Sequence, residues 1–460
     1  MGDRRDLGFL FNPKSIAVVG ATDAPGRLSR IIMESLTLGG FPGAVYPVNP
    51  KYKEVMGMRC YPSLRSVGAE IDLAVMAVPA PLTVDIFKNA RGGLRAAVVI
   101  SGGFSETGPG GKAMEDELRG VAEKEGIRVV GPNCMGLYDT VSRVDTLFIS
   151  RERVRRPRPG AIAILSQSGS FALTAMDEFS SLGIGVSRVV SYGNRMDVNE
   201  ADCLDFLAED ASTGAVVLYI EGIEDGGRFV EAASRCAREK TVMAMKVGKG
   251  RAGGSAARSH TGAMAGRYEV YRAAFKKAGV IEVAGYEEFM DGCRALNRLP
   301  RSRGVRIMII TDGGGMGAAI ADACEAAGLE VPMLPEEKRA PLLRLFPSYF
   351  TVANPLDLTG SVTDEWMRGA LSETLKGDSY DLAIVAALWG PPGLTDAMPG
   401  MLSAVAKASG KPVVICSPGG DYTKAKKPLF EKEGFAVFDT PEAAVRAARV
   451  LAGRQRARYG

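Results

Sequence analysis

Two stretches, Ala163–Leu173 (AILSQSGSFAL) and Met308–Ala318 (MIITDGGGMGA), share one pattern at an offset of 145 residues. Each begins with an apolar run typical of a buried parallel strand, passes through a turn of small residues, and enters a run with helical periodicity. Gly183 and Gly328, also 145 residues apart, follow the helical runs where glycine commonly ends a helix. The sequence therefore predicts two diverged copies of one strand–turn–helix unit.

The same alternation of strand-like and helical runs extends along the whole chain and predicts an α/β fold with parallel sheets. We expect a nucleotide-type, Rossmann-like domain at 1–150, followed by two similar α/β domains at 151–300 and 301–460. The first boundary falls in the arginine-rich segment 151–160, which we interpret as a solvated linker.

Composition excludes several classes of protein. The 460 residues are 46% apolar and 24% charged, with a net charge of +4, so bulk charge indicates neither nucleic-acid nor membrane binding. No apolar signal core follows the N-terminus, and no stretch approaches the length of a membrane span. The seven cysteines are scattered and form no CxxC pair, which indicates free thiols in a cytoplasmic protein.

His260 is the single histidine of the chain and lies in a segment of small residues, SHTGAMAG at 259–266. Such a segment allows a ligand to approach closely, and imidazole suits proton transfer or covalent chemistry. A metal site is disfavoured, because no second histidine is present. On these residues alone, a structural and a functional role for His260 remain equally open.

Three further features are candidates for a functional site. The two repeat turns place small residues, with uncovered backbone N–H groups, at the start of a predicted helix. Glu221 ends the apolar run Val216–Ile220, where a carboxylate can orient an imidazole, although a solvated strand end is the alternative. The expected phosphate-binding residues are Ser168, Gly169, Ser170, Gly313, Gly314 and Gly315.

The first predicted strand–helix turn runs from Gly20 to Gly26 and suits a phosphate, although it lacks the GxGxxG pattern. No acidic residue ends the second strand to accept a hydrogen bond from a ribose hydroxyl. Lys51 stands there instead, which favours a ribose bearing its own phosphate. NADP and coenzyme A both fit, and a plain surface lysine remains open.

The chain resembles the α subunits of nucleoside-diphosphate-forming acyl-CoA synthetases, relatives of succinyl-CoA synthetase, over nearly its whole length. Each motif is weak alone, and the order of the motifs makes the resemblance specific. They are VGAT at 19–22, YPVNP at 46–50, SGGFSETG at 101–108, GPNCMG at 131–136, SQSGS at 166–170, YIEG at 219–222, SHTGAMAG at 259–266, TDGGGMG at 311–317 and NPLDLTG at 354–360.

The resemblance implies a CoA-binding Rossmann-like domain followed by two flavodoxin-like ligase domains. It also implies that His260 is transiently phosphorylated, that Glu221 orients it, and that the two helix starts cradle the phosphohistidine. An ATP-grasp β subunit, in an α2β2 assembly, would then bind ADP or ATP with Mg²⁺, because that module is not recognised here. The residues implied in CoA binding are Gly20, Thr22, Lys51, Pro79, Gly102 and Asn133.

Three functions therefore compete. An acyl-CoA synthetase subunit acting on a small carboxylic acid or its acyl-CoA accounts for all the motifs. An NADP-dependent oxidoreductase accounts for the first domain only. A non-catalytic CoA-binding regulatory subunit accounts for the fold, and the intact His260 and Glu221 argue against it.

Overall fold

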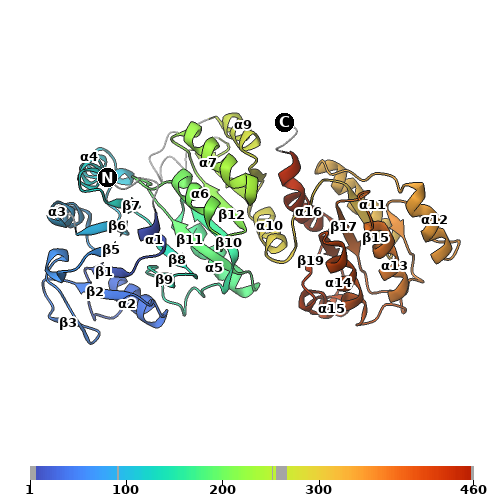
Figure 1. The fold of residues 1–460 in the computed structure, drawn as a ribbon, viewed down its shortest axis with the longest axis horizontal. Coiled ribbons are helices and arrows are strands. Elements are labelled where there is room, and N and C mark those ends of the chain that lie inside the picture. Colours follow the sequence, from blue (N-terminus) through green and yellow to red (C-terminus); the bar gives the residue numbers. More distant parts are fainter. Residues whose placement is uncertain (1–6, 91–92, 251, 255–266, 457–460) are drawn as a thin grey trace. The chain divides into compact units, whose positions relative to one another are not determined.

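The computed structural model describes residues 7–90, 93–250, 252–254 and 267–456. The chain forms two compact units, Met1–Glu282 and Val283–Gly460 (Figure 1). The first unit contains two large sheets and the second contains one, and the strands in these sheets are mostly parallel. The expected α/β class is confirmed, whereas the division into three domains remains a prediction.

The first sheet has five parallel strands in the order β2-β1-β5-β6-β7. Its strands are β1 (Ser15–Val19), β2 (Ala44–Val48), β5 (Ile71–Met76), β6 (Leu94–Val99) and β7 (Arg128–Val130). Helices α1 (Gly8–Phe11), α2 (Leu28–Leu38), α3 (Ala80–Ala90) and α4 (Pro109–Glu125) accompany it, and the short strands β3 (Glu54–Val55) and β4 (Met58–Arg59) form a hairpin. On β1, Ile16 and Val18 face one core while Ala17 and Val19 face the other, as the two-residue period of a strand requires.

The second sheet has seven strands in the order β14-β13-β12-β10-β11-β8-β9. Its parallel centre consists of β10 (Pro159–Ser166), β11 (Val186–Ser191), β12 (Ala215–Ile220) and β13 (Thr241–Lys246), and the other strands are β8 (Gly136–Asp139), β9 (Val144–Asp145) and β14 (Ile281–Val283). Helices α5 (Gly169–Ser181), α6 (Glu200–Glu209), α7 (Gly226–Glu239) and α9 (Tyr268–Ala278) accompany it. The antiparallel pairing of β8 with β9 and β11 was not predicted.

The second unit is built on one parallel sheet in the order β16-β15-β17-β18-β19. Its strands are β15 (Ile307–Thr311), β16 (Leu356–Asp357), β17 (Leu382–Ala386), β18 (Val413–Cys416) and β19 (Ala436–Phe438). Helices α10 (Tyr286–Arg298), α11 (Gly314–Ala326) and α16 (Pro441–Arg456) share one core, and α12 (Glu336–Leu345), α13 (Asp364–Leu375), α14 (Met398–Ser409) and α15 (Asp421–Lys432) share the other. Within this unit, Asp291 of α10 pairs with Arg446 of α16 at 2.7 Å, so α10 packs with the sheet that follows it.

The structure confirms the internal repeat. Helix α5 runs from 169 to 181 and α11 from 314 to 326, so the offset is 145 residues at both ends. The turns before the helices are closed in the same way: the Ser166 hydroxyl donates to the Ser168 carbonyl at 2.7 Å, and the Thr311 hydroxyl donates to the Gly313 carbonyl at 2.9 Å.

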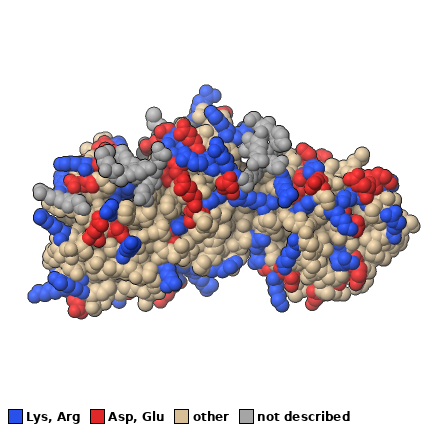
Figure 2. All heavy atoms as spheres, in the orientation of Figure 1, with Lys and Arg blue, Asp and Glu red and all other residues tan. Residues whose placement is uncertain are grey.

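Basic and acidic side chains are interspersed over the face of the molecule in Figure 2. Within the described part of the chain, no helix is both long enough and apolar enough to cross a bilayer. Most residues of the segment 151–160 are exposed, as expected of a solvated segment, and Arg156 is an exception. The Arg156 side chain is only 4% exposed and pairs with Asp145 of β9 at 3.0 Å, because β9 places a buried carboxylate beside it.

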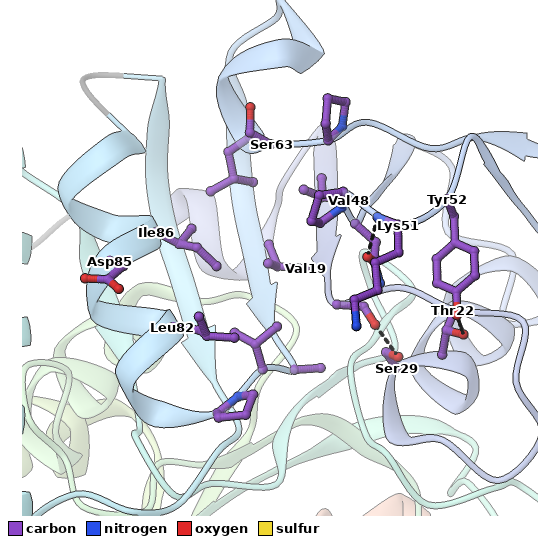
Figure 3. Close-up of a pocket in the computed structure, with 18 of the residues that line it drawn as sticks. Val19, Thr22, Ser29, Val48, Lys51, Tyr52, Ser63, Leu82, Asp85 and Ile86 are labelled. Carbon is purple, nitrogen blue, oxygen red and sulfur yellow. Dashed lines mark hydrogen bonds between the residues drawn. The ribbon is translucent and has the colours of Figure 1, made fainter.

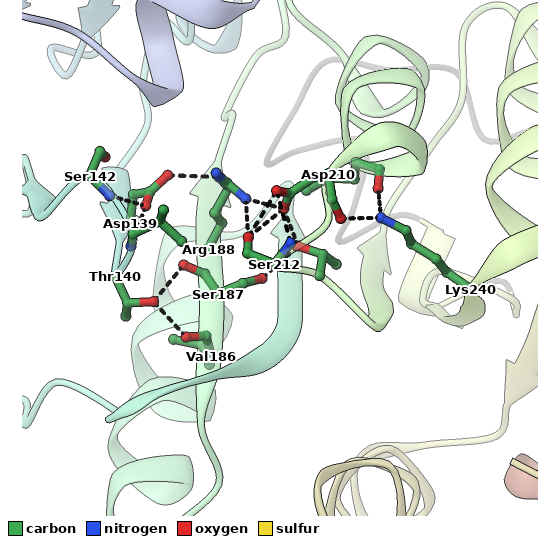
Figure 4. A network of polar contacts seen from close by, with 12 residues as sticks. Asp139, Thr140, Ser142, Val186, Ser187, Arg188, Asp210, Ser212 and Lys240 are labelled. Carbon is green, nitrogen blue, oxygen red and sulfur yellow. Dashed lines mark hydrogen bonds and ion pairs between the residues drawn. The ribbon is translucent and has the colours of Figure 1, made fainter. Parts of the chain in front are cut away.

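A buried ion network ties β8 to the parallel part of the second sheet (Figure 4). Arg188 on β11 pairs with Asp139 on β8 at 2.7 Å and with Asp210 after α6, and donates a hydrogen bond to Ser212 at 2.8 Å. Burial raises the pKa of the Asp139 carboxyl, and the charge of Arg188 opposes that shift. Removal of Arg188 would therefore leave buried carboxylates without their cation.

We predict that Arg188→Met lowers the free energy of unfolding of the first unit by about 3–5 kcal/mol. Denaturant unfolding followed by circular dichroism measures this change. The matched control is Lys112→Met on α4, because Lys112 and its partner Asp116 are about half exposed. The control should change stability little, and an equal loss in both variants would contradict the structural role of the buried network.

Candidate functional site

A cavity of about 1060 Å³ opens at the carboxyl ends of β1, β2 and β5 (Figure 3). Gly20, Thr22, Lys51 and Pro79, four of the residues expected to bind CoA, line it. This is the edge of a parallel sheet where ligands of α/β proteins usually bind. The sequence therefore located the edge of the sheet correctly.

Gly20 has a backbone conformation and a packing that require glycine. Its φ is +87°, and a Cβ atom there would lie 2.7 Å from the carbonyl oxygen of Ala77. The Gly20 carbonyl accepts a hydrogen bond from the hydroxyl of Ser29 on α2 at 2.7 Å. The β1–α2 turn is thus held against β5 and leaves the cavity open beside it.

The charge and shape of the cavity suit an anionic ligand with an apolar part. Arg27 and Arg65 line it together with Lys51, while Leu82 and Ile86 of α3 form an apolar wall (Figure 3). The sequence analysis missed both arginines. Arg27 directly precedes α2, which was a usable signal, whereas Arg65 lies in a short 3₁₀ helix that no pattern predicted.

Gly102 and Asn133 do not line this cavity. They lie beside each other, since a Cβ on Gly102 would be 3.4 Å from the amide oxygen of Asn133. The Asn133 amide donates to Asn194 at 3.3 Å, and Asn194 donates to Glu106 at 2.7 Å. These residues form a polar cluster that joins the loops of the first sheet to the turn after β11.

Glu221 and Ser168 lie at the same edge of the second sheet, because β10 and β12 are paired neighbours that end just before them. Ser168 caps α5: its hydroxyl accepts from the N–H of Phe171 at 3.3 Å and lies 3.0 Å from the hydroxyl of Ser170. Gly169 is required there, since a Cβ would lie 2.2 Å from a side-chain carbon of Met135. The structure thus brings together Glu221 and the expected phosphate-binding residues of α5.

The start of α11 has a different chemical character. Gly313 directly precedes α11, and Gly314 and Gly315 begin it, as expected. A Cβ on Gly314 would lie 2.6 Å from a carboxylate oxygen of Asp357. Burial raises the pKa of neighbouring Asp312 to about 6. Two carboxyl groups make this helix end less favourable for an anion than that of α5, and its role in phosphate binding remains a prediction.

The structure adds a basic residue that the sequence analysis missed. Lys246, at the end of β13, is 4% exposed and donates to the carbonyl of Glu221 at 2.8 Å. Burial lowers the pKa of this ammonium group, and the Glu221 carboxylate opposes the shift. His260 lies outside the described residues.

Among the described residues, no group of three or more histidine, cysteine or acidic side chains could hold a metal ion. The seven cysteines are buried free thiols. The site therefore consists of an anion-compatible cavity on the first sheet, and a carboxylate, a lysine and a helix start on the second.

Comparison with known families gives two matches. Residues 14–140 match a CoA-binding domain, and residues 159–296 match the succinyl-CoA ligase like flavodoxin domain. The α subunit of ADP-forming acetate–CoA ligase I from Pyrococcus furiosus is 35% identical over 97% of both chains.

The chain belongs to this α-subunit family. ADP-forming acetate–CoA ligase I of Archaeoglobus fulgidus is 39% identical over 96% of this chain, which spans only 63% of that longer protein. In three dimensions, acetyl-coenzyme A synthetase 1 of Candidatus Korarchaeum cryptofilum, solved with phosphate and ADP, matches with a TM-score of 0.91. It is 33% identical, and the match covers 99% of this chain and 98% of that one.

Proposed function

We propose that the chain is the α subunit of an ADP-forming acyl-CoA synthetase, an acid–thiol ligase. The observation that carries this proposal is its 35% identity to an acetate–CoA ligase α subunit over 97% of both chains. The overall reaction interconverts acyl-CoA, ADP and phosphate with a carboxylate, CoA and ATP. The names of the two acetate–CoA ligases compared above favour a small acyl group such as acetyl.

The proposed mechanism has three steps, each a transfer of an acyl or phosphoryl group. A phosphate oxygen attacks the thioester carbonyl, the C–S bond breaks, and CoA leaves with a proton on sulfur. A nitrogen of His260 then attacks phosphorus in the acyl phosphate, so that an N–P bond forms as the P–O bond to the carboxylate breaks. Attack by ADP on the phosphohistidine yields ATP and restores the imidazole.

The described residues supply the binding and positioning in this scheme. The cavity on the first sheet binds CoA, with Gly20, Thr22, Lys51 and Pro79 in its lining. The start of α5, with Ser168 and Ser170, stabilises the charge of the phosphoryl group during transfer. Glu221 orients the imidazole of His260. The NADP alternative has no support from the comparisons.

Nucleotide binding is assigned to a partner. We propose an ATP-grasp β subunit that binds ADP with Mg²⁺, in a lasting complex such as α2β2. The name of the Pyrococcus furiosus relative, a subunit alpha, supports the existence of a second subunit. The glycine-rich turn at 311–317 does not match the GxxxxGK[ST] pattern of a P-loop.

We predict that Lys51→Ala weakens CoA binding about tenfold and dephospho-CoA binding much less, because a charge-assisted hydrogen bond contributes about 1.5–3 kcal/mol. Calorimetry with both ligands and with NADP measures the difference. Lys53→Ala is the control, since Lys53 does not line the cavity. Equal losses of affinity for CoA and dephospho-CoA would show that Lys51 does not contact the 3′-phosphate. Tighter binding of NADP than of CoA would overturn the choice of ligand.

We predict that acetyl phosphate labels the chain with an acid-labile, base-stable phosphate. His260→Asn should abolish the label without loss of CoA binding, and Glu221→Gln should slow labelling about 10–100-fold, as loss of an orienting partner does. Radiolabel incorporation and mass spectrometry measure both effects. Label retained in His260→Asn would show that His260 is not the phosphorylated residue. A wild-type chain that binds CoA but takes no label would favour the non-catalytic alternative.

We predict that the chain forms ATP only together with its partner. The assay contains acetyl-CoA, phosphate, ADP and Mg²⁺, with and without a candidate ATP-grasp subunit. His260 should be phosphorylated in both cases, because that step uses only groups of this chain. ATP formation by the homogeneous chain alone would reveal a nucleotide site on it and contradict the division of labour.

A further inference from the structure

The turn that carries Glu221 is held by side chains from two other strand ends and from the turn after β11. The Glu221 N–H donates to the amide oxygen of Gln167, and the Glu221 carbonyl accepts from Lys246 at 2.8 Å. The Gly222 N–H donates to the same Gln167 oxygen at 2.9 Å, and the Gly222 carbonyl accepts from Gln167 at 2.8 Å and from Arg195 at 2.6 Å. All four backbone polar groups of Glu221 and Gly222 thus bond to side chains.

Gln167 contributes three of these hydrogen bonds and is 2% exposed. An amide side chain suits this place, because it combines an acceptor for two N–H groups with a donor for a carbonyl. Its own backbone N–H donates to the carbonyl of Tyr219 at 3.3 Å. Both its backbone and its side chain therefore fix it against the end of β12.

Gln167 also directly precedes Ser168, the residue that caps α5. The hydroxyl of Ser166 on its other side accepts from the Ser168 N–H at 3.2 Å and donates to the Ser168 carbonyl. Movement of Gln167 would therefore shift the cap of α5 as well as the Glu221 turn. One residue joins the carboxylate to the helix end where the phosphoryl group would bind.

The second copy of the repeat shows which of these contacts belong to the fold in general and which occur only beside Glu221. Asp312, 145 residues after Gln167, accepts from the N–H of Leu388 at 2.9 Å and so closes the turn after β17. Closure of a neighbouring turn is thus common to both copies. The two copies differ in two respects. Gln167 bonds to a residue that carries a carboxylate, Glu221, whereas Asp312 bonds to Leu388, and Gln167 also donates a hydrogen bond to a carbonyl.

We propose that Gln167 is a positioning residue that fixes the Glu221 carboxylate relative to the start of α5, and thereby sets the rate of His260 phosphorylation. The proposal rests on the proposed function. In this proposal Gln167 acts through Glu221 and not directly on the reacting groups. Because its contacts lie within the first unit, they need no partner subunit to form.

The first test is structural and does not depend on catalysis. Gln167→Met retains a side chain of similar length and removes all three hydrogen bonds. Hydrogen exchange of the amides of Glu221 and Gly222 should accelerate in this variant. The control is Thr140→Val, which removes two side-chain hydrogen bonds, to the carbonyls of Val186 and Ser187, elsewhere in the same sheet. Unchanged exchange at Glu221 and Gly222 would overturn the proposal.

The second test is a double-mutant cycle on labelling by acetyl phosphate. Gln167→Met should lower the maximal labelling rate about 10–100-fold, with CoA affinity unchanged and Thr140→Val near the wild-type rate. In a Glu221→Gln background the same substitution should slow labelling less than about twofold, since Gln167 acts through that carboxylate. Equal slowing in both backgrounds, or none in the wild type, would overturn the proposal. Absence of label from the wild-type chain would instead overturn the proposed function, and this proposal with it.

Discussion

A buried backbone N–H or carbonyl needs a hydrogen-bond partner, and the carboxyl ends of parallel strands are where the sheet ceases to supply one. In the second sheet this requirement falls on the turn after β12. Gln167 and Lys246 from flanking strand ends, together with Arg195, meet it. The polar groups that satisfy the fold therefore gather at the edge where a ligand would bind. The ammonium group of Lys246 also makes a cation–π contact, since it lies 4.5 Å from the centre of the Tyr271 ring.

The two copies of the repeat have the same strand–turn–helix backbone but different polar side chains around the start of the helix. Ser166 and Thr311 close their turns through equivalent hydrogen bonds, so the backbone at the two helix starts is alike. The surrounding side chains are not alike. The start of α5 has the hydroxyls of Ser168 and Ser170, whereas the start of α11 lies beside Asp312 and Asp357. The backbone N–H groups favour an anion at both helix starts. The hydroxyls of Ser168 and Ser170 add donors at α5, where Glu221 is the neighbouring carboxylate, whereas, among the described residues, two carboxyl groups and no hydroxyl pair lie beside the start of α11.

The sequence predicted those parts of the fold that depend on periodicity and on glycine. The central strands and the repeat were predicted, and so were two strand-end edges, that of the first sheet with Gly20 and Lys51 and that of the second with Glu221, because apolar runs and strand-ending turns leave local patterns. The hairpin of β8 and β9 was missed because both strands are short, and Arg156 was misinterpreted because its partner Asp145 lies on that hairpin. Gln167 stood within a recognised motif, but its three hydrogen bonds reach residues 54 and 55 positions away, which no local pattern records.

The cavity and the Glu221 turn rest on one continuous core within the first unit. Ile16 and Val18, on the strand that ends just before Gly20, belong to the same buried cluster as Leu218 and Ile220, on the strand that ends just before Glu221. Close packing makes such a cluster resist small displacements, so the core fixes the distance between the cavity and the Glu221 turn. Hydrogen-bonded side chains also bridge the loops at these strand ends. The Asn133–Asn194–Glu106 cluster is one such bridge, because it joins a loop of the first sheet to the turn that also carries Arg195, which holds Gly222.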